Sequence, residues 1–228
     1  MWIDNLVLEK HSRPLFITTW VPDNRVVILG SGNKSDREVN TKFCQREGIP
    51  ILKRSGGGGT VVLYPGCVII GVGTWVRNPF GNDRYFRILN EGVVSSLVEG
   101  MGEDIGFGLN GISDITLGEK KVAGTSMFRS KNYLLYQASL IVDIDCELIE
   151  RTLQYPSREP SYRAGRSHSD FVTGICKYKE ISAQKICEFL QVNLQVNVEK
   201  ALGDELVEPD PHQYKNIVRR MQYNQSSY

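Results

Sequence analysis

The sequence predicts an α+β fold in which mixed or antiparallel sheets are flanked by helices. Short apolar runs rich in β-branched and aromatic residues outnumber the stretches with helical periodicity. Two of these runs flank Gly118-Glu119-Lys120, a spacing typical of an antiparallel hairpin. Four consecutive glycines, Gly56 to Gly59, separate two other apolar runs. We therefore expect short strands arranged around one glycine-rich connection.

The N-terminal part of the chain is predicted to contain short strands and one surface helix. Residues Trp2 to Lys10 are typical of an amphipathic helix. Val39 and Phe43 are four residues apart and predict a surface helix from Glu38 to Glu47. The expected strands are Phe16 to Trp20, Val26 to Leu29, Ile49 to Leu52, Val61 to Tyr64 and Val68 to Thr74, the last two as a pair.

The C-terminal part alternates helices with long strands. Apolar residues recur on one face of Arg84 to Gly100, with Asp83 as the expected N-cap. A second amphipathic helix is expected from Ser182 to Leu194, with Ser182 as its N-cap. The other expected elements are the hairpin Asp114 to Leu117 and Lys121 to Ser126, the strand Tyr133 to Asp145, the helix Cys146 to Leu153 and the loop Tyr155 to Asp170.

The length and pattern of the chain predict one main domain, residues 1–194, followed by a polar tail, residues 195–228, that packs on that domain or extends from it. The tail has few apolar side chains, so we do not expect it to bury a core of its own. One short helix is expected in it, around Tyr214 to Met221.

Composition excludes several classes of function. The 228 residues carry a net charge of +1, which gives no support for a nucleic-acid or membrane-surface protein. No apolar run approaches the roughly 20 residues that span a bilayer. The five cysteines include no C-x-x-C pair, and the three histidines are far apart. These features argue against a disulfide framework or a zinc site and favour a cytoplasmic protein.

The glycine run has the features of a binding loop for an anionic or acyl-nucleotide ligand. Glycine permits close approach of a ligand to the backbone, and Arg54 and Thr60 add a cation and a hydroxyl at either end. A flexible hairpin loop is the alternative interpretation. The candidate binding residues are Arg54, Ser55, Gly56, Gly57, Gly58, Gly59 and Thr60.

The hairpin after Asp114 offers a candidate catalytic lysine. Neighbouring side chains on a strand point to opposite faces, so only one of Lys120 and Lys121 can enter a pocket. We expect Lys121 to share its face with the small residues Ala123 and Thr125, which leave room for a ligand. The alternative is that both lysines are solvated in the hairpin. When the lysine pair is considered alone, this alternative is better supported.

Three further positions are candidates on weaker grounds. Asp114 is a candidate ligand for Mg²⁺ on a nucleotide, or equally a turn-capping aspartate. Arg163, Arg166 and His168 lie in the long loop and are candidates for closing over an anionic ligand. The alternative is an ordinary solvated basic stretch.

Taken in order, these segments resemble the lipoate–protein ligase family, which is grouped with biotin protein ligases and octanoyltransferases. The resemblance covers roughly residues 2–194. Its most specific parts are Arg54 to Val61 and the hairpin that ends in Gly118-Glu119-Lys120-Lys121-Val122-Ala123-Gly124-Thr125-Ser126. Weaker parts are residues 5–9, 26–30, 137–140 and 166–175.

The resemblance implies attachment of lipoate, or octanoate, to a lysine of a carrier domain through an acyl-adenylate made from ATP with Mg²⁺. The carriers would be lipoyl domains of 2-oxoacid dehydrogenase E2 or glycine cleavage H protein. Lys121 would touch the acyl carbonyl and the phosphate. The glycine run, Arg54 and the segment Gly124, Thr125 and Ser126 would line the acyl and adenylate site, and Asp114 would lie near the metal. The loop Tyr162 to Phe171 would fold over the adenylate.

The sequence departs from the family pattern at three places. Leu63 stands where the family usually has His, Ser113 where it usually has Asn, and Gln137-Ala138 where it has a His-Gly type pair. Lost polar contacts at these positions would weaken catalysis or change substrate choice. The family's accessory C-terminal domain is also expected to be absent, so a separate subunit could supply it.

Two alternatives to the ligase follow from the same resemblance. One is an octanoyl or lipoyl transferase that takes the acyl group from an acyl carrier or lipoyl donor protein through a cysteine thioester. The loop Gln154 to Arg166 contains no cysteine, which disfavours it. The other is a catalytically weak relative that binds an adenylate or a carrier. The choice between lipoate and octanoate, the carrier and the oligomeric state are left open by the sequence.

Overall fold

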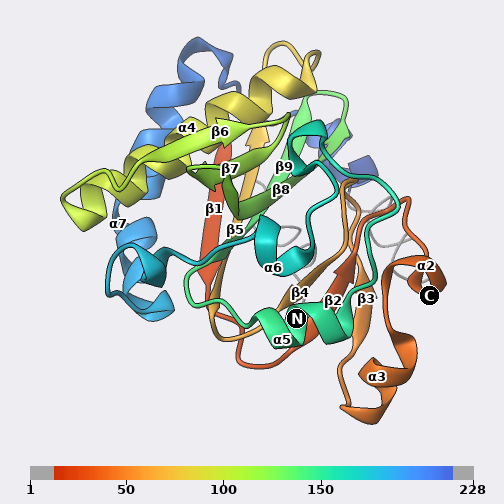
Figure 1. The fold of residues 1–228 in the computed structure, drawn as a ribbon. Helices are drawn as coiled ribbons and strands as arrows, with labels where there is room; N and C mark the ends of the chain where they lie inside the picture. The colour runs from red at the N-terminus through yellow and green to blue at the C-terminus, as the bar shows by residue number, and fades with distance from the viewer. Residues whose placement is uncertain (1–12, 218–228) are drawn as a thin grey trace.

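Two β-sheets form the centre of the protein in a computed structural model, which describes residues 13–217 (Figure 1). The larger sheet has six strands in the order β1-β5-β9-β8-β7-β6, and every neighbouring pair is antiparallel. Its strands are β1 (Leu15–Trp20), β5 (Cys67–Trp75), β6 (Phe107–Asn110), β7 (Asp114–Leu117), β8 (Lys120–Ser130) and β9 (Tyr133–Ile141).

The smaller sheet has three strands, β2 (Val26–Leu29), β3 (Ile51–Lys53) and β4 (Val61–Leu63), in the order β3-β2-β4. β2 pairs parallel with β3 and antiparallel with β4. The prediction of mixed and antiparallel sheets is therefore confirmed.

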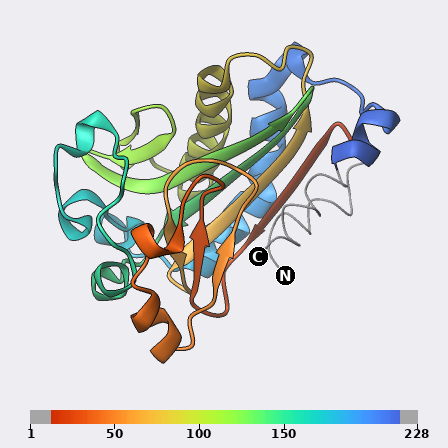
Figure 2. The ribbon, with the colours of Figure 1, turned by 90° about the vertical axis from the view of Figure 1, so that its right-hand side faces the viewer.

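Two long helices, α4 (Asn82–Met101) and α7 (Ala183–Leu202), cover one face of the larger sheet, opposite the small sheet (Figure 2). The alternation along β5 shows how both faces are buried. Val68, Ile70 and Val72 contact the helices, whereas Cys67 and Ile69 face the small sheet. Such burial explains the nearly continuous apolar sequence of this strand.

The second core lies between the two sheets and extends to the short helices beside them. These are α2 (Ser35–Glu38), α3 (Thr41–Arg46), α5 (Cys146–Thr152) and α6 (His168–Phe171). Three 3₁₀-helices complete the described elements: η1 (Ser161–Arg163), η2 (Ile175–Lys177) and η3 (Gly203–Glu205).

Two local predictions were wrong in the N-terminal part. The surface helix expected from 38 to 47 is interrupted at Val39, whose extended backbone bridges to Leu153. Both Val39 and Phe43 are buried in the second core. The expected β4–β5 pair does not form, because these strands belong to different sheets. The four-residue spacing of Val39 and Phe43 predicted one helix and did not reveal that the helix is broken between Glu38 and Thr41.

The long helices differ from the prediction at their ends. α4 is preceded by Gly81 rather than capped by Asp83, and Gly102 ends it in the left-handed conformation at φ 73°. α7 has the expected cap, since the Ser182 side chain accepts from the amide of Lys185. It continues to Leu202 because Val198 and Leu202 also reach the core. α7 therefore crosses the predicted domain boundary at residue 194. The division into a main domain and a tail stays a prediction.

Some predictions fall on the chain ends. The helix expected over Trp2 to Lys10 lies outside the described residues. Residues 211–217 are helical, so the helix expected around Tyr214 begins earlier, and its remainder lies outside the described part. Within residues 13–217, we find no helix with the length and hydropathy needed to span a bilayer.

Candidate functional site

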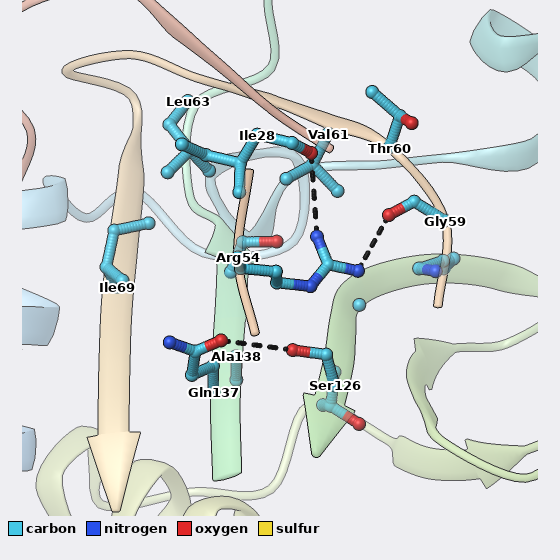
Figure 3. Close-up of a pocket in the computed structure, with 14 residues that line it drawn as sticks. Ile28, Arg54, Gly59, Thr60, Val61, Leu63, Ile69, Ser126, Gln137 and Ala138 are labelled. Atoms are coloured by element: carbon cyan, nitrogen blue, oxygen red, sulfur yellow. Dashed lines mark hydrogen bonds between the residues drawn. The ribbon is translucent and has the colours of Figure 1, made fainter. Parts of the chain in front are cut away.

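A pocket lies between the two sheets, where β2 and β4 face β5, β8 and β9. Figure 3 shows apolar Ile28, Val61 and Leu63 on one side of the Arg54 guanidinium, with Ser126 and Gln137 on the other. The complete lining is Ile28, Arg54, Gly59, Thr60, Val61, Leu63, Ile69, Lys121, Gly124, Thr125, Ser126, Gln137, Ala138 and Ser139. Such a site suits an apolar chain that ends in a polar or charged group.

The glycine run connects β3 to β4 across the end of β2, and so it is not a hairpin loop. Its carbonyl groups are held by donors from the protein. Arg54 Nη2 lies 2.7 Å from the carbonyl oxygens of both Gly57 and Gly59. Asn33 Nδ2 donates to the carbonyl of Gly58 at 3.1 Å and to Thr60 Oγ1 at 3.0 Å. The guanidinium of Arg54 therefore shapes the loop at the edge of the pocket.

The glycines of this loop serve different purposes. Gly58 has φ +90°, a conformation that L side chains avoid. A β-carbon at Gly30, beneath the loop, would lie 2.1 Å from the carbonyl oxygen of Gly58. By contrast, a β-carbon at Gly57 or Gly59 would meet no atom within 4 Å. The backbone at Gly57 and Gly59 is therefore open to approach.

Lys121 enters the pocket and pairs with Asp114 on the neighbouring strand, with Nζ 2.8 Å from Oδ1. The lysine side chain is 24% exposed, whereas that of Asp114 is 8% exposed. Water is partly excluded here, so this ion pair is screened less than a surface pair. Asp114 thus holds the Lys121 side chain at the pocket wall.

A β-bulge beside Lys121 gives this residue different neighbours from those predicted. The register of β7 and β8 shifts between Ile115 and Thr116, and as a result Val122 and Ala123 both enter the helix-side core. A β-carbon at Gly124 would lie 2.9 Å from Nζ of Lys121. Lys121 therefore packs over Gly124. The expectation that it shares a face with Ala123 was wrong, whereas Thr125 lines the pocket together with Lys121, as expected.

The long loop is fixed to this hairpin. Tyr162 Oη donates to Asp114 Oδ2 at 2.8 Å, and the amide of Thr173 donates to the Lys121 carbonyl at 2.9 Å. Burial and the Asp114 charge raise the pKa of Tyr162 well above its usual range. The phenol consequently keeps its proton and acts as a donor.

The two loop arginines shape the loop itself. The buried Arg163 lies against the rings of Tyr155 and Phe171, at 5.0 and 4.9 Å, and its Nε donates to the carbonyl of Arg166. Arg166 donates to the carbonyls of Tyr162, Arg163 and Glu119. His168 Nε2 contacts the carbonyl of Gln154, and burial lowers the pKa of its imidazole.

The structure divides the predicted residues into two groups, those that line the pocket and those that do not. The predicted residues that line the pocket are Arg54, Gly59, Thr60, Lys121, Gly124, Thr125 and Ser126. Those outside its lining are Ser55, Gly56, Gly57, Gly58, Asp114, Arg163, Arg166 and His168. Asp114 joins the site through Lys121, and the loop joins through Tyr162.

Asn33 and Tyr162 are among the residues of the site that sequence reasoning missed, as are the apolar and polar lining residues Ile28, Val61, Leu63, Ile69, Gln137, Ala138 and Ser139. Asn33 reaches the glycine loop from a turn 25 residues earlier, and Tyr162 reaches Asp114 across 48 residues. No spacing rule links such distant positions. The available signals were the turn residues around Asn33 and the position of Tyr162 at the start of the loop expected to fold over the adenylate.

Residues 1–195 match the family described as "Lipoyl protein ligase A/B catalytic domain". The chain belongs to this family. The match spans the pocket, the glycine loop and the lysine hairpin.

Curated relatives carry ligase and transferase names. "Lipoate-protein ligase A subunit 1" of Thermoplasma acidophilum is 28% identical over 72% of this chain, and "Lipoate--protein ligase" of Streptococcus pyogenes is 24% identical over 87%. The chain spans 64% and 59% of the lengths of these two relatives. "Octanoyltransferase LipM" of Clostridioides difficile is 25% identical over 93% of this chain and 84% of its own length.

Solved structures share the fold. One, titled as a bi-partite lipoate protein ligase and its E2 lipoyl domain from Thermoplasma acidophilum, superposes with a TM-score of 0.72 at 20% identity. It covers 95% of this chain and 84% of the other. A lipoate-protein ligase A bound with ATP gives a TM-score of 0.70 at 21% identity, over 95% and 85% of the two chains. These likenesses confirm the predicted ligase-like catalytic fold.

Proposed function

We propose that the protein attaches lipoate, or octanoate, to a lysine of a lipoyl carrier domain through an acyl-adenylate. One observation carries the proposal. An apolar pocket between two sheets has a paired lysine in its wall and a glycine loop at its edge. The family match and the ligase names of two relatives support it.

The reaction has two steps. The acyl carboxylate oxygen attacks the α-phosphorus of ATP, and the bond to pyrophosphate breaks. The amine of the carrier lysine then attacks the acyl carbonyl, a C–N bond forms, and AMP leaves as a proton is released. The ammonium of Lys121 would stabilise negative charge on the phosphate and on the carbonyl oxygen in both steps.

The residues of the pocket suit an acyl-adenylate. Ile28, Val61 and Leu63 would contact the acyl chain, since their side chains form the apolar side of the cavity. The open backbone at Gly57 and Gly59 would allow the adenylate to approach the loop. The loop with Arg163, Arg166 and His168 would cover the adenylate, with the two arginines maintaining its shape.

Magnesium fits this site only together with a nucleotide. Among residues 13–217, no group of three or more His, Cys, Asp or Glu side chains is placed to hold a metal. Each carboxylate oxygen of Asp114 already accepts one hydrogen bond, and a carboxylate has about four acceptor sites. Asp114 would therefore supply one ligand and the phosphates most of the rest.

The carrier and the compartment are proposed on the same basis. The solved relative described with its E2 lipoyl domain supports a lipoyl domain as the acceptor, and its bi-partite description supports a separate accessory subunit. All five cysteines are free thiols, which supports a reducing compartment, and we propose the cytoplasm.

The deciding experiment incubates the protein with lipoate, Mg-ATP and an apo lipoyl domain and measures intact mass. We expect the carrier to gain one lipoyl group, and to gain none when ATP is omitted. Omission of lipoate is the second control. Absence of the adduct in the complete reaction, and also from synthetic lipoyl-adenylate, would contradict the proposal and favour a binding relative.

The octanoyltransferase is the second candidate, because that relative matches along most of its own length. It requires a cysteine nucleophile, and none of the described residues that line the pocket is a cysteine. Cys44, Cys67 and Cys187 are buried, and burial raises the pKa of the Cys67 thiol to about 12.

We predict that serine is tolerated at each cysteine: Cys44, Cys67, Cys146, Cys176 and Cys187. Acyl transfer from a preformed adenylate should continue in every variant, because no thiol lies in the pocket lining. Mass spectrometry after incubation with octanoyl carrier protein provides the check. A trapped thioester on any cysteine would favour the transferase.

A further inference from the structure

Tyr162 is fixed at three points, and this places its hydroxyl group. Its ring lies 5.1 Å from the ring of Phe171, its carbonyl accepts from Arg166 at 2.7 Å, and its hydroxyl donates to Asp114. A tyrosine anchored at its ring and backbone has little freedom to move its hydroxyl. The contact with Asp114 is therefore built into the loop.

Asp114 connects this hydroxyl to the lysine. One oxygen of its carboxylate accepts from Tyr162 and the other lies 2.8 Å from Nζ of Lys121. A carboxylate held at one oxygen cannot rotate freely about its side-chain bond, so the phenol also fixes the oxygen that faces Lys121. The orientation of the ammonium then depends on a residue that does not touch it.

The loop and the hairpin are joined at two further places, which keep this arrangement in register. Arg166 Nη1 donates to the carbonyl of Glu119 in the hairpin turn at 3.2 Å. The Thr173 amide donates to the Lys121 carbonyl at 2.9 Å. The loop thus contacts the hairpin at the turn and at the start of β8, in addition to the Tyr162–Asp114 hydrogen bond.

We propose that Tyr162 is a positioning residue that acts through Asp114 to orient Lys121 toward the pocket. The effect on acyl transfer rests on the proposed function, whereas the orientation of Lys121 does not. The substitution Tyr162→Phe keeps the ring that packs on Phe171 and removes only the hydroxyl. Tyr155→Phe is a matched control. It also removes a tyrosine hydroxyl from this loop, but that hydroxyl donates to Glu159 rather than to Asp114.

The first test measures how fast acetic anhydride modifies Lys121, with adjacent Lys120 as an internal reference. In Tyr162→Phe, we expect Lys121 to react about tenfold faster, since a hydrogen bond to a charged group is lost. The rate of modification of Lys120 should not change, and Tyr155→Phe should give the same rates as the protein without substitutions. An unchanged rate would overturn the proposal, as would a slower rate, which would mean that the phenol competes with Lys121 for Asp114.

A double-mutant cycle separates positioning from a general structural effect. Asp114→Asn should also accelerate the modification of Lys121, and adding Tyr162→Phe should then have no further effect. Additive effects would show that Tyr162 acts by another route and would overturn the proposal. Thermal unfolding of each variant verifies that the labelled protein is folded.

The second test measures acyl transfer from lipoyl-adenylate to an apo lipoyl domain. Tyr162→Phe should lower kcat by about tenfold with little change in KM for the carrier, because a misplaced catalytic group slows the reaction. If the protein without substitutions shows no transfer while the labelling result holds, the proposed function fails and the positioning role stands. Unchanged kcat in an active protein would overturn the role in catalysis.

Discussion

Lys121 is the residue on which the proposed chemistry depends. It lines the pocket, its ammonium contacts Asp114, and its side chain passes over Gly124, where a β-carbon would force the end of the lysine to shift. Lys120, directly beside it, does not line the pocket. This asymmetry allows two neighbouring lysines to serve as test and control.

We predict that Lys121→Ala reduces adenylate formation by about 100-fold or more, because it removes a fixed cation from the site of developing negative charge. Lys120→Ala should change the rate by no more than about twofold, as expected for a solvated charge. Pyrophosphate release measures the first step, and circular dichroism verifies folding. Loss of activity in the Lys120 variant alone would contradict the assignment.

His168 makes stability depend on pH. Its pKa is lowered mainly by burial, and Arg163 and Lys121 act in the same direction, against the contact with Gln154 and the charge of Glu150. The unfolded chain, with an imidazole pKa of about 6.5, then binds more protons than the native state at slightly acidic pH. Neutral His168 therefore contributes stability that is present above that value and lost below it.

We predict that His168→Gln flattens the decrease in unfolding free energy between about pH 7 and pH 5, where the unfolded imidazole gains its proton. Urea unfolding at several pH values provides the measurement. Equal slopes for the variant and the parent protein would assign the pH dependence to other groups.

At the scale of elements, the glycine loop combines a fixed frame with an open backbone. Arg54 and Asn33 hold its carbonyls, and Gly58 adopts a left-handed conformation. Gly57 has no neighbour that a β-carbon would meet. Adjacent glycines are thus expected to respond differently to the same substitution.

Gly58→Ala should lower the unfolding free energy by about 1–2 kcal/mol, the cost of a left-handed conformation for an L residue. Gly57→Ala should leave stability within about 0.5 kcal/mol and instead weaken binding of the nucleotide, if the adenylate approaches there. Chemical denaturation and nucleotide titration of both variants separate the two effects. Equal destabilisation by both substitutions would show that the loop has no open position.

Strands and long helices were predictable because their signals are local. β-branched runs gave β1, β2 and β5, and the face of Leu89, Val93 and Leu97 gave α4. The antiparallel hairpin of β7 and β8 was also predictable from its short turn. The pairing of the strands around the glycine run was not predictable, since this run joins β3 and β4 across the strand between them. That arrangement depends on contacts between distant segments, which no local pattern reports.

The site was predictable to a similar extent. Lys121, Arg54 and Thr60 were identified from residue type and resemblance, and they line one pocket. The neighbours of Lys121 were assigned by strict alternation, which the bulge at Val122 breaks. Asn33 and Tyr162 contribute through contacts over long sequence separations, so only the folded structure reveals them.

At the scale of the whole molecule, the proposed accessory subunit would decide which half-reaction the chain performs well. The name of the archaeal relative, subunit 1, and the bi-partite ligase among the solved structures support assistance from a second protein. Adenylate formation is the step that we assign to this assistance. Transfer from a finished adenylate should need only the pocket and Lys121.

We therefore predict faster lipoylation of an apo lipoyl domain from synthetic lipoyl-adenylate than from lipoate and ATP, by about tenfold or more under one set of conditions. Intact-mass time courses with both substrates provide the comparison. Equal rates with the purified chain alone would show that no second subunit is required.

The bulge at Val122 makes the hairpin sensitive to length. On β7 the paired residues Ile115 and Thr116 are adjacent, whereas their partners on β8, Ala123 and Lys121, are separated by Val122. Deleting one of these three β8 residues would restore regular alternation and turn either the lysine or the segment after it to the opposite face, with little change in hydropathy. Among relatives of this chain, a gap at this point would consequently signal changed chemistry, even where every named side chain is retained.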